Sequence, residues 1–251
     1  MFEKLKIVSL NIDHLSFSKS LDQVTEWALN KRSSYVCFAN VHMIIEAYKN
    51  HSFLVKVNDA DLVLADGKPV AIACKILHHK KQERISGMDL APRVLEKANE
   101  NKLSVFVYGS TAEVHDAIKE KINFKYPDIV LGGFISPPFR NLTENEIQND
   151  IETINRSGPH IILVALGCPK QEKWMAENSN KINAVLLGIG GALPVIAGIH
   201  KRAPRWMQNM ALEWLYRLIQ QPGRLFKRYV YTNSWFLFLL VKDWIKTLLK
   251  K

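Results

Sequence analysis

Asp66 is the residue with the clearest capacity for chemistry. The segment ADGKPV places it at the end of an apolar run and directly before Gly67. A carboxylate at a strand end can act as a general base that removes a proton from a hydroxyl nucleophile. An Asp-Gly turn without a catalytic role is the alternative, and the dipeptide by itself favours it. Arg84, in KQERISGMDL, could pair with a diphosphate or with Asp66, or be a solvated charge.

VYGSTAEV also ends an apolar run and opens a helical period, and it contains Gly109, Ser110 and Thr111. Free backbone amides at a helix N-terminus attract phosphate, so this segment could contact a phosphorylated ligand. Ser110 or Thr111 could equally be a plain N-cap residue. The glycine pattern G-x-G-x-x-G is absent, which argues against a nicotinamide-linked enzyme.

GCPKQE (167–172) repeats this arrangement, with a proline suited to a first helical turn. Lys170 and Gln171 can therefore face a ligand. Cys168 could be a thiolate activated by the helix N-terminus. No convincing Cys-His-Asn arrangement accompanies it, so a small apolar filler is the favoured interpretation.

The sequence predicts neither a metal site nor a cofactor. NDADL holds Asp59 and Asp61 two positions apart, a pattern that binds a divalent cation in many sugar-nucleotide enzymes. Asp61, however, begins an apolar run, at the end opposite to the one where ligands bind, so a solvated turn is favoured. The eight histidines show no H-x-x-x-H spacing, and the three cysteines are far apart. This cysteine pattern fits a reducing compartment rather than a zinc site.

Short β-rich runs alternate with helical periods over residues 1–200, which predicts βαβ units and a parallel sheet with helices on both faces. The expected strands are 35–40, 61–66, 103–110, 128–133, 160–167 and 183–191. Ligands bind beyond the carboxyl ends of such strands. The residues that follow the strands are therefore the candidates for contact with substrate: Asn40, Asp66, 109–111, 167–171 and 188–191, among them Gly190 and Gly191.

The C-terminal segment 201–251 carries almost all the excess charge. It holds eleven Lys and Arg against two Asp and Glu, while the whole chain has a net charge of +10. Such a footprint indicates an anionic partner: nucleic acid, a membrane surface or a phosphorylated substrate. Leu, Phe and Trp crowd the basic residues, which favours lipid over nucleic acid. The apolar run 235–241 is too short to span a bilayer, and no signal peptide is expected at the N-terminus.

A set of motifs in a fixed order carries a resemblance over roughly residues 30 to 230. They are FANVHMIIEA, ADLVLADGKPV, RISGMDL, VFVYGST, ALGCPKQEKWM, GIGGALPVIAGIHKRAP and ALEWLYRLIQQPGRLFKRY. The chain resembles the WecG/TagA/CpsF glycosyltransferases. The resemblance implies a metal-independent, inverting enzyme that moves a sugar from a UDP donor onto polyprenyl-diphosphate-linked N-acetylglucosamine. N-acetylmannosamine or its uronate is the implied sugar, with glucose or mannose as alternatives.

The resemblance also implies roles for individual residues. Asp66 corresponds to the proposed general base, Asn40 and Gln171 to pocket residues, and Arg84 to the arginine before the SG-x-DL segment. The arginines that correspond to those thought to bind the lipid diphosphate are Arg217, Arg224 and Arg228. Relatives often have Thr two positions before the asparagine, where this chain has Phe38. The loss of that hydroxyl leaves the preference for donor and acceptor open.

The fold prediction is thus an α/β, Rossmann-like body (1–200) with a basic, helical C-terminal appendage (201–251). The aromatic side chains of the appendage suit a membrane interface, where it would lie on anionic lipid and close over the active site. The expected location is the cytoplasm, peripheral on the inner face of the cell membrane. A homo-oligomer is an open prediction, as is the question whether residues 230–251 belong to the fold. A nucleic-acid-binding protein is the rival hypothesis.

Overall fold

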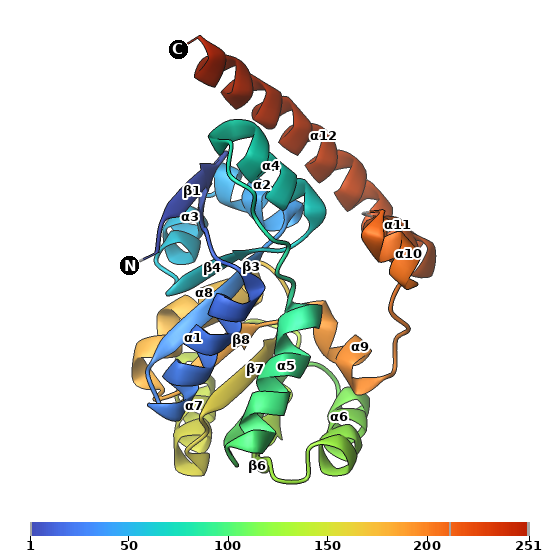
Figure 1. Cartoon of the computed structure of the whole chain (residues 1–251). Coiled ribbons are helices and arrows are strands. Elements are labelled where there is room, and N and C mark those ends of the chain that lie inside the picture. The colour runs from blue at the N-terminus through green and yellow to red at the C-terminus, as the bar shows by residue number, and fades with distance from the viewer. Residues whose placement is uncertain (1, 211, 250–251) are drawn as a thin grey trace.

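The computed structural model describes residues 2–210 and 212–249, and it contains the predicted parallel sheet (Figure 1). Six parallel strands lie in the order β4-β3-β8-β7-β5-β6. Five of them are buried along most or all of their length, because helices cover both faces of the sheet. The strands are β3 (Ser34–Ala39), β4 (Leu62–Ala65), β5 (Ser104–Gly109), β6 (Val130–Ile135), β7 (Ile161–Ala165) and β8 (Val185–Gly188).

Alternate residues of each strand enter two separate apolar clusters, one on each face of the sheet. In β3, Val36 and Phe38 point to one cluster, and Cys37 and Ala39 to the other. The first face is covered by α1 (Phe17–Leu29), α5 (Gly87–Glu100), α6 (Ala112–Lys125) and α9 (Leu193–Ala197). The second is covered by α2 (Val41–Lys49), α3 (His51–Asn58), α4 (Lys68–His78), α7 (Glu144–Ser157) and α8 (Lys170–Asn178). Two short 3-10 turns, Ser179–Lys181 and Gly190–Ala192, complete the body.

An antiparallel hairpin that the sequence did not predict precedes the sheet. It consists of β1 (Lys4–Ile7) and β2 (Leu10–Asp13). Ile7, Leu10 and Ile12 are completely buried in the second cluster. Asp13 Oδ2 accepts a hydrogen bond from the backbone N–H of Val63 in β4 at 2.7 Å. The hairpin therefore covers the end of the sheet at which β4 lies.

Three helices form the C-terminal appendage: α10 (Arg205–Asn209), α11 (Glu213–Gln220) and α12 (Pro222–Leu248). A linker rises from α9 to α10, and α12 then runs along α2 and α4 (Figure 1). Phe236, Leu239 and Leu240 are buried and belong to the same apolar cluster as α2 and α4. Residues up to Leu240 therefore pack as part of the fold, which answers the open question for residues 230–240.

The opposite side of α12 remains apolar and exposed. Its exposed residues include Phe226, Val230, Trp235, Leu237, Phe238, Val241, Trp244, Ile245 and Leu248. No helix within residues 2–210 and 212–249 has the length and the apolar character that crossing a membrane requires.

Candidate active site

Asp66 and Asn40 meet because β3 and β4 are neighbours in the sheet. Asn40 follows β3 and Asp66 follows β4, and the backbone N–H of Asp66 donates to the carbonyl of Ala39 at 2.9 Å. The Asn40 side chain caps α2, where Oδ1 accepts from the backbone N–H of Met43 at 3.1 Å. The same amide also hydrogen bonds to the carboxylate of Asp66. Asn40 is thus held by the helix start and in turn orients Asp66.

The surroundings of Asp66 make it a stronger base than an exposed aspartate. Withdrawal from water raises the pKa of this half-buried carboxyl to about 6. The guanidinium groups of Arg217 and Arg84 and the hydrogen bond from Asn40 act in the opposite direction, while the charge of Glu213 raises the pKa further. A base with a pKa near the working pH combines a populated ionised form with a useful proton affinity.

Arg84 lies in an ion-pair cluster that joins the appendage to the body. We use "ion-pair cluster" for Arg84, Asp89, Arg202 and Glu213. Arg84 contacts Asp89 at 2.7 Å and also pairs with Glu213, and Arg202 contacts Asp89 at 2.6 Å and Glu213 at 3.4 Å. Arg84 is therefore not a solvated charge, and carboxylates other than Asp66 take its direct contacts. A catalytic role for Arg84 remains a prediction, with a long-range effect on Asp66 as its support.

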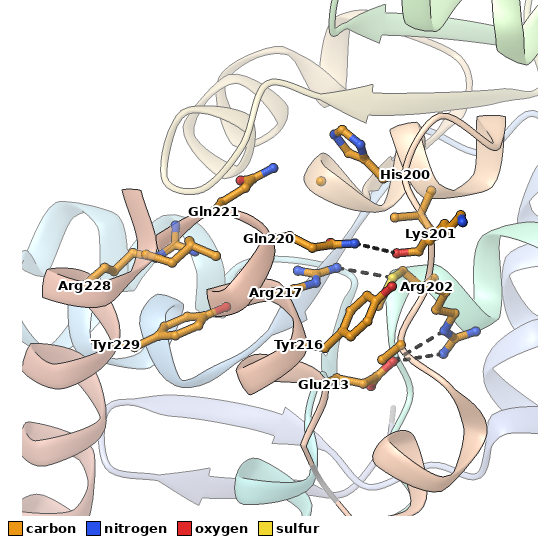
Figure 2. A pocket seen from close by; sticks show the side chains of 15 residues that line it. His200, Lys201, Arg202, Glu213, Tyr216, Arg217, Gln220, Gln221, Arg228 and Tyr229 are labelled. Carbon is orange, nitrogen blue, oxygen red and sulfur yellow. Dashed lines mark hydrogen bonds and ion pairs between the residues drawn. The ribbon is translucent and has the colours of Figure 1, made fainter. Parts of the chain in front are cut away.

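A pocket lies between the linker after α9 and the helices α11 and α12 (Figure 2). It encloses about 550 Å³, including its open mouth, and is rich in cationic side chains. Arg217 and Arg228 both line it. The one hydrogen bond shown by Arg217 goes to the sulfur of Met88 at 3.2 Å, and Arg228 Nε is buried without a hydrogen-bond partner in the described residues. Two arginines with spare donors suit a ligand rich in acceptor oxygens.

Comparison with known protein families and curated proteins agrees with this architecture. Residues 5–250 match the family described as "Glycosyl transferase WecG/TagA/CpsF family". The chain belongs to this glycosyltransferase family. Two relatives are both named N-acetylglucosaminyldiphosphoundecaprenol N-acetyl-beta-D-mannosaminyltransferase. The Bacillus subtilis (strain 168) protein is 32% identical over 195 residues, which cover 77% of this chain and 74% of the relative. The Staphylococcus aureus (strain MRSA252) protein is 29% identical over 231 residues, 88% of each chain.

Gln171 of this glycosyltransferase connects the loops that follow two strands. Its Oε1 accepts from the backbone N–H of Gly167 at 3.1 Å, and its Nε2 donates to the carbonyl of Gly188 at 2.7 Å and to Glu172 at 2.7 Å. A side chain at Gly190 would approach Gln171 Oε1 to 2.9 Å, so the glycine leaves room for this bridge. Contact of Gln171 with substrate remains a prediction, and the geometry supports a positioning role beside it. Gly191 reaches the pocket directly.

Glu172 is a buried acid that the sequence did not single out. Its side chain is completely buried, and this burial raises its pKa to about 7 although Gln171 donates to it. Cys168 also hydrogen bonds to it, and burial raises the pKa of the Cys168 thiol. A thiol in these surroundings is a poor source of thiolate, which supports the filler interpretation of Cys168.

Replacement of Gln171 with methionine tests the bridge between the two loops. Methionine has a similar length but no polar atoms, so Gly167 N–H, Gly188 C=O and a Glu172 oxygen lose a partner. We expect the free energy of unfolding to fall by about 2–4 kcal/mol, because buried groups without partners are costly. Gln148→Met is the matched control, since the Gln148 side chain is exposed and donates a hydrogen bond to the exposed side chain of Glu152. Urea denaturation of both variants measures the difference, and equal stability would contradict the bridge.

Gly109, Ser110 and Thr111 lie at the carboxyl end of β5. Gly109 has a φ of +100°, and a Cβ there would approach the backbone of Ala165 in β7 to 2.7 Å, so close strand packing requires this glycine. Ser110 receives a hydrogen bond on its carbonyl from Ser136 Oγ at 2.6 Å, and Thr111 is the N-cap of α6 without a side-chain cap bond. Contact of this segment with phosphate remains a prediction.

Asp61 has structural partners. It pairs with Arg32 at 2.9 Å and accepts from the backbone N–H of Tyr35 at 3.0 Å, so it anchors the start of β3. Within residues 2–210 and 212–249, no three His, Cys, Asp or Glu side chains come together as metal ligands would. The side chain of Arg224 lies outside the described part of the structure, so its predicted contact with the lipid diphosphate stays a prediction.

Proposed function

We propose that this glycosyltransferase moves N-acetylmannosamine from a UDP donor onto polyprenyl-diphosphate-linked N-acetylglucosamine, with inversion and without a metal ion. The names of the relatives support the sugar and the acceptor. The observation that carries the proposal is the position of Asp66 directly after β4, at the carboxyl edge of the sheet, where Asn40 hydrogen bonds to it and the charge of Arg217, a residue of the pocket, acts on it. The comparisons offer no support for a glucose or mannose donor, and family membership favours a glycosyltransferase over a nucleic-acid-binding protein.

In the proposed reaction, Asp66 receives the proton of the acceptor hydroxyl as its oxygen attacks the anomeric carbon of the sugar. The bond from this carbon to the UDP oxygen breaks, and its electron pair leaves with the diphosphate. Arg217 and Arg228 supply positive charge to diphosphate oxygens, a form of electrostatic stabilisation that acts best in a pocket with little water. Asn40 keeps the Asp66 carboxylate oriented toward the acceptor.

The remaining predicted contacts follow from the carboxyl edge of the sheet. The segments with these contacts lie at or just after strand ends on this edge, where parallel α/β sheets bind their ligands: Gly109, Ser110, Thr111, Gly190 and Gly191. We propose that these segments contact the donor nucleotide. We propose that Arg224, on the helix that Pro222 begins, contacts the lipid diphosphate. Arg217 and Arg228, for which the resemblance implies the same contact, are assigned here to the diphosphate of UDP.

The test is UDP release by purified full-length protein. A panel of UDP-sugars is offered with and without a lipid-diphosphate N-acetylglucosamine analogue in detergent. We expect release that requires both UDP-N-acetylmannosamine and the lipid acceptor. Release with UDP-glucose or UDP-mannose instead would replace the proposed donor. No release with any donor from folded protein, together with no binding of the lipid analogue, would overturn the proposal.

We also propose that the appendage lies on anionic lipid at the cytoplasmic face of the cell membrane. Trp235 and Phe238 form an edge-to-face pair on the exposed side of α12 and are 40% and 59% exposed. Lys242 and Lys246 are exposed on the same helix. Aromatic rings beside basic residues suit the headgroup region of a membrane. Dimer formation, which would cover part of this apolar side, remains a prediction for light scattering to test.

A double replacement, Trp235→Ser with Phe238→Ser, should weaken sedimentation with phosphatidylglycerol-containing vesicles about tenfold or more, because two large apolar groups no longer leave water. Phe124→Ser is the matched control. Phe124 is 92% exposed but lies on α6, away from the appendage (Figure 1). Binding of the control should equal that of the unaltered protein. Equal binding by the double variant would mean that another surface meets the lipid.

A further inference from the structure

The ion-pair cluster is a closed ring in which each acid contacts both arginines. Asp89 Oδ2 faces Arg84 and Oδ1 faces Arg202, while Glu213 Oε2 faces Arg84 and Oε1 faces Arg202. The four side chains are 17–28% exposed, so solvent screens their interactions less than those of surface pairs. Two positive and two negative charges cancel within the ring.

The ring connects two parts of the chain that are distant in sequence, the segment of Arg84 and Asp89 and the segment of Arg202 and Glu213. Asp89 lies in the first turn of α5, Arg202 in the linker and Glu213 at the start of α11. Arg217 follows Glu213 by four residues on the same short helix, so the two side chains share a helix face. The ring therefore anchors the turn that directly precedes Arg217 and fixes this arginine in the pocket.

The four described arginines of the pocket and the ring consequently fall into two groups. Arg84 and Arg202 are neutralised by the two acids of the ring. In the part of the chain that the structure describes, Arg217 and Arg228 form no ion pair with an acid, although both line the pocket (Figure 2). Positive charge that is available for a diphosphate is thereby separated from positive charge that holds the appendage in place.

Glu213 has a second effect, on the charge balance around Asp66. The groups that act on Asp66 are Arg84 from the loop before α5, Arg217 and Glu213 from α11, and the amide of Asn40. Both arginines favour the ionised carboxylate, whereas Glu213 disfavours it and so raises the pKa of Asp66. A carboxylate that is stabilised too strongly accepts a proton less readily and is a weaker general base.

We propose that Glu213 is a positioning residue that neutralises Arg84, keeps Asp66 a competent base and anchors α11 so that Arg217 meets the diphosphate. This inference rests on the proposed function, in which Asp66 is the base. It assigns Arg84 to the support of the site rather than to direct contact with substrate. Glu213 lines the pocket, but its two carboxylate oxygens accept hydrogen bonds from Arg84 and Arg202.

The experiment compares the pH dependence of kcat/KM for UDP release in Glu213→Gln and in the unaltered protein between pH 5 and 9. Activity of the unaltered protein should rise through about pH 6 as Asp66 ionises. In Glu213→Gln, Arg84 loses one of its two acids, which lowers the pKa of Asp66. We expect the rise in kcat/KM to occur about half a pH unit lower than in the unaltered protein. The plateau value of kcat/KM at high pH should fall about tenfold, because Asp66 is a weaker base and Arg217 is less well positioned.

Two further variants separate charge from shape. Glu213→Asp retains the charge on a shorter side chain, so the position of the rise should return toward that of the unaltered protein. Asp89→Asn removes the other acid of the ring and should move the rise in the same direction as Glu213→Gln, which keeps the test available if that variant folds poorly. Glu96→Gln is the matched control. Glu96 also contacts two cations, Arg93 and Lys125, but on the surface of the body. Its replacement should change neither the pH at which kcat/KM rises nor the plateau of kcat/KM.

In both Glu213→Gln and Asp89→Asn, the plateau of kcat/KM could fall while the pH of its rise stays unchanged. That result would overturn the electrostatic role of Glu213 and leave only a structural one. Failure of the underlying proposal has a different signature. If Asp66→Asn retained full activity, Asp66 would not be the base, whatever the behaviour of Glu213. An inactive Asp66→Asn together with an unmoved rise in the ring variants would contradict this inference alone.

Discussion

Turnover by Asp66→Asn is expected to fall about a thousandfold, which is within the range that positioned general bases contribute. Asparagine has nearly the same shape and can still hydrogen bond to Asn40, but it cannot accept the proton of the acceptor hydroxyl. The loss should therefore lie in kcat, with the binding of the UDP-sugar largely retained. Steady-state UDP release with the lipid acceptor and a separate titration of UDP binding measure the two quantities.

Asp116→Asn provides the matched control for this prediction. Asp116 is exposed on α6, and its replacement should leave turnover unchanged. The fold of Asp66→Asn should also persist. Burial raises the pKa of Asp66, so its ionised form opposes folding above about pH 6, and a neutral amide at pH 7.5 should leave the melting temperature equal or slightly higher. Full turnover by folded Asp66→Asn would remove Asp66 from the role of base.

The place of Asp66 could be predicted because strand ends are visible in an α/β sequence. Each of the six predicted apolar runs became a strand, and ligands approach such sheets at the carboxyl edge. The contact between Asp66 and Asn40 could not be predicted from strand ends alone, because it depends on β3 and β4 being neighbours in the sheet. Sequential order alone does not determine strand order, as β8 lies between β3 and β7 here.

The partners of Arg84 could not be predicted for a related reason. Asp89 lies five residues away and within the quoted motif RISGMDL, but Glu213 is 129 residues further along the chain. Opposite charges on distant segments give no signal of pairing in one sequence, whereas the motifs KRAP and EWLYRL showed only that the appendage carries charge. The hydrogen bonds of Gln171 could not be predicted either, because the same sequence pattern fits an amide that faces a ligand and an amide that joins two loops.

Two elements illustrate how packing resolves ambiguous patterns. The hairpin β1–β2 has strands of four residues, too short for an alternating pattern to be distinguished from a loop. In α12, the apolar run 235–241 fits either a lipid surface or a protein core. The structure divides it: Phe236, Leu239 and Leu240 enter the core, while Trp235, Leu237 and Phe238 remain exposed. One helix thus has an inward apolar side and an outward one.

Arg217→Ala is expected to lower kcat/KM for UDP release about a hundredfold or more. Among the charges that act on Asp66, that of Arg217 lowers its pKa most, and Arg217 forms no ion pair with an acid in the described residues. Its guanidinium, which donates to the sulfur of Met88, can therefore also bind the diphosphate of UDP as negative charge develops there. Removal of one such donor from an active site commonly costs two to three orders of magnitude in rate. Arg217→Lys should restore only part of the activity, because an ammonium group lacks the paired donors of a guanidinium.

Arg205→Ala serves as the matched control, since Arg205 is exposed on the neighbouring helix α10 and forms no ion pair with any residue in 2–210 or 212–249. Its activity should remain within about twofold of the unaltered protein, which would separate the position of Arg217 from the general positive charge of the appendage. Salt adds a second criterion. A steering effect of net charge weakens steeply as ionic strength rises, whereas a contact in a half-buried pocket does not. If both arginine variants lost activity equally, and the loss disappeared in high salt, the appendage would act on the substrate through its field alone. A loss of activity that is confined to Arg217→Ala and persists in high salt would instead show that Arg217 contacts the diphosphate of UDP in the site where Asp66 contacts the acceptor.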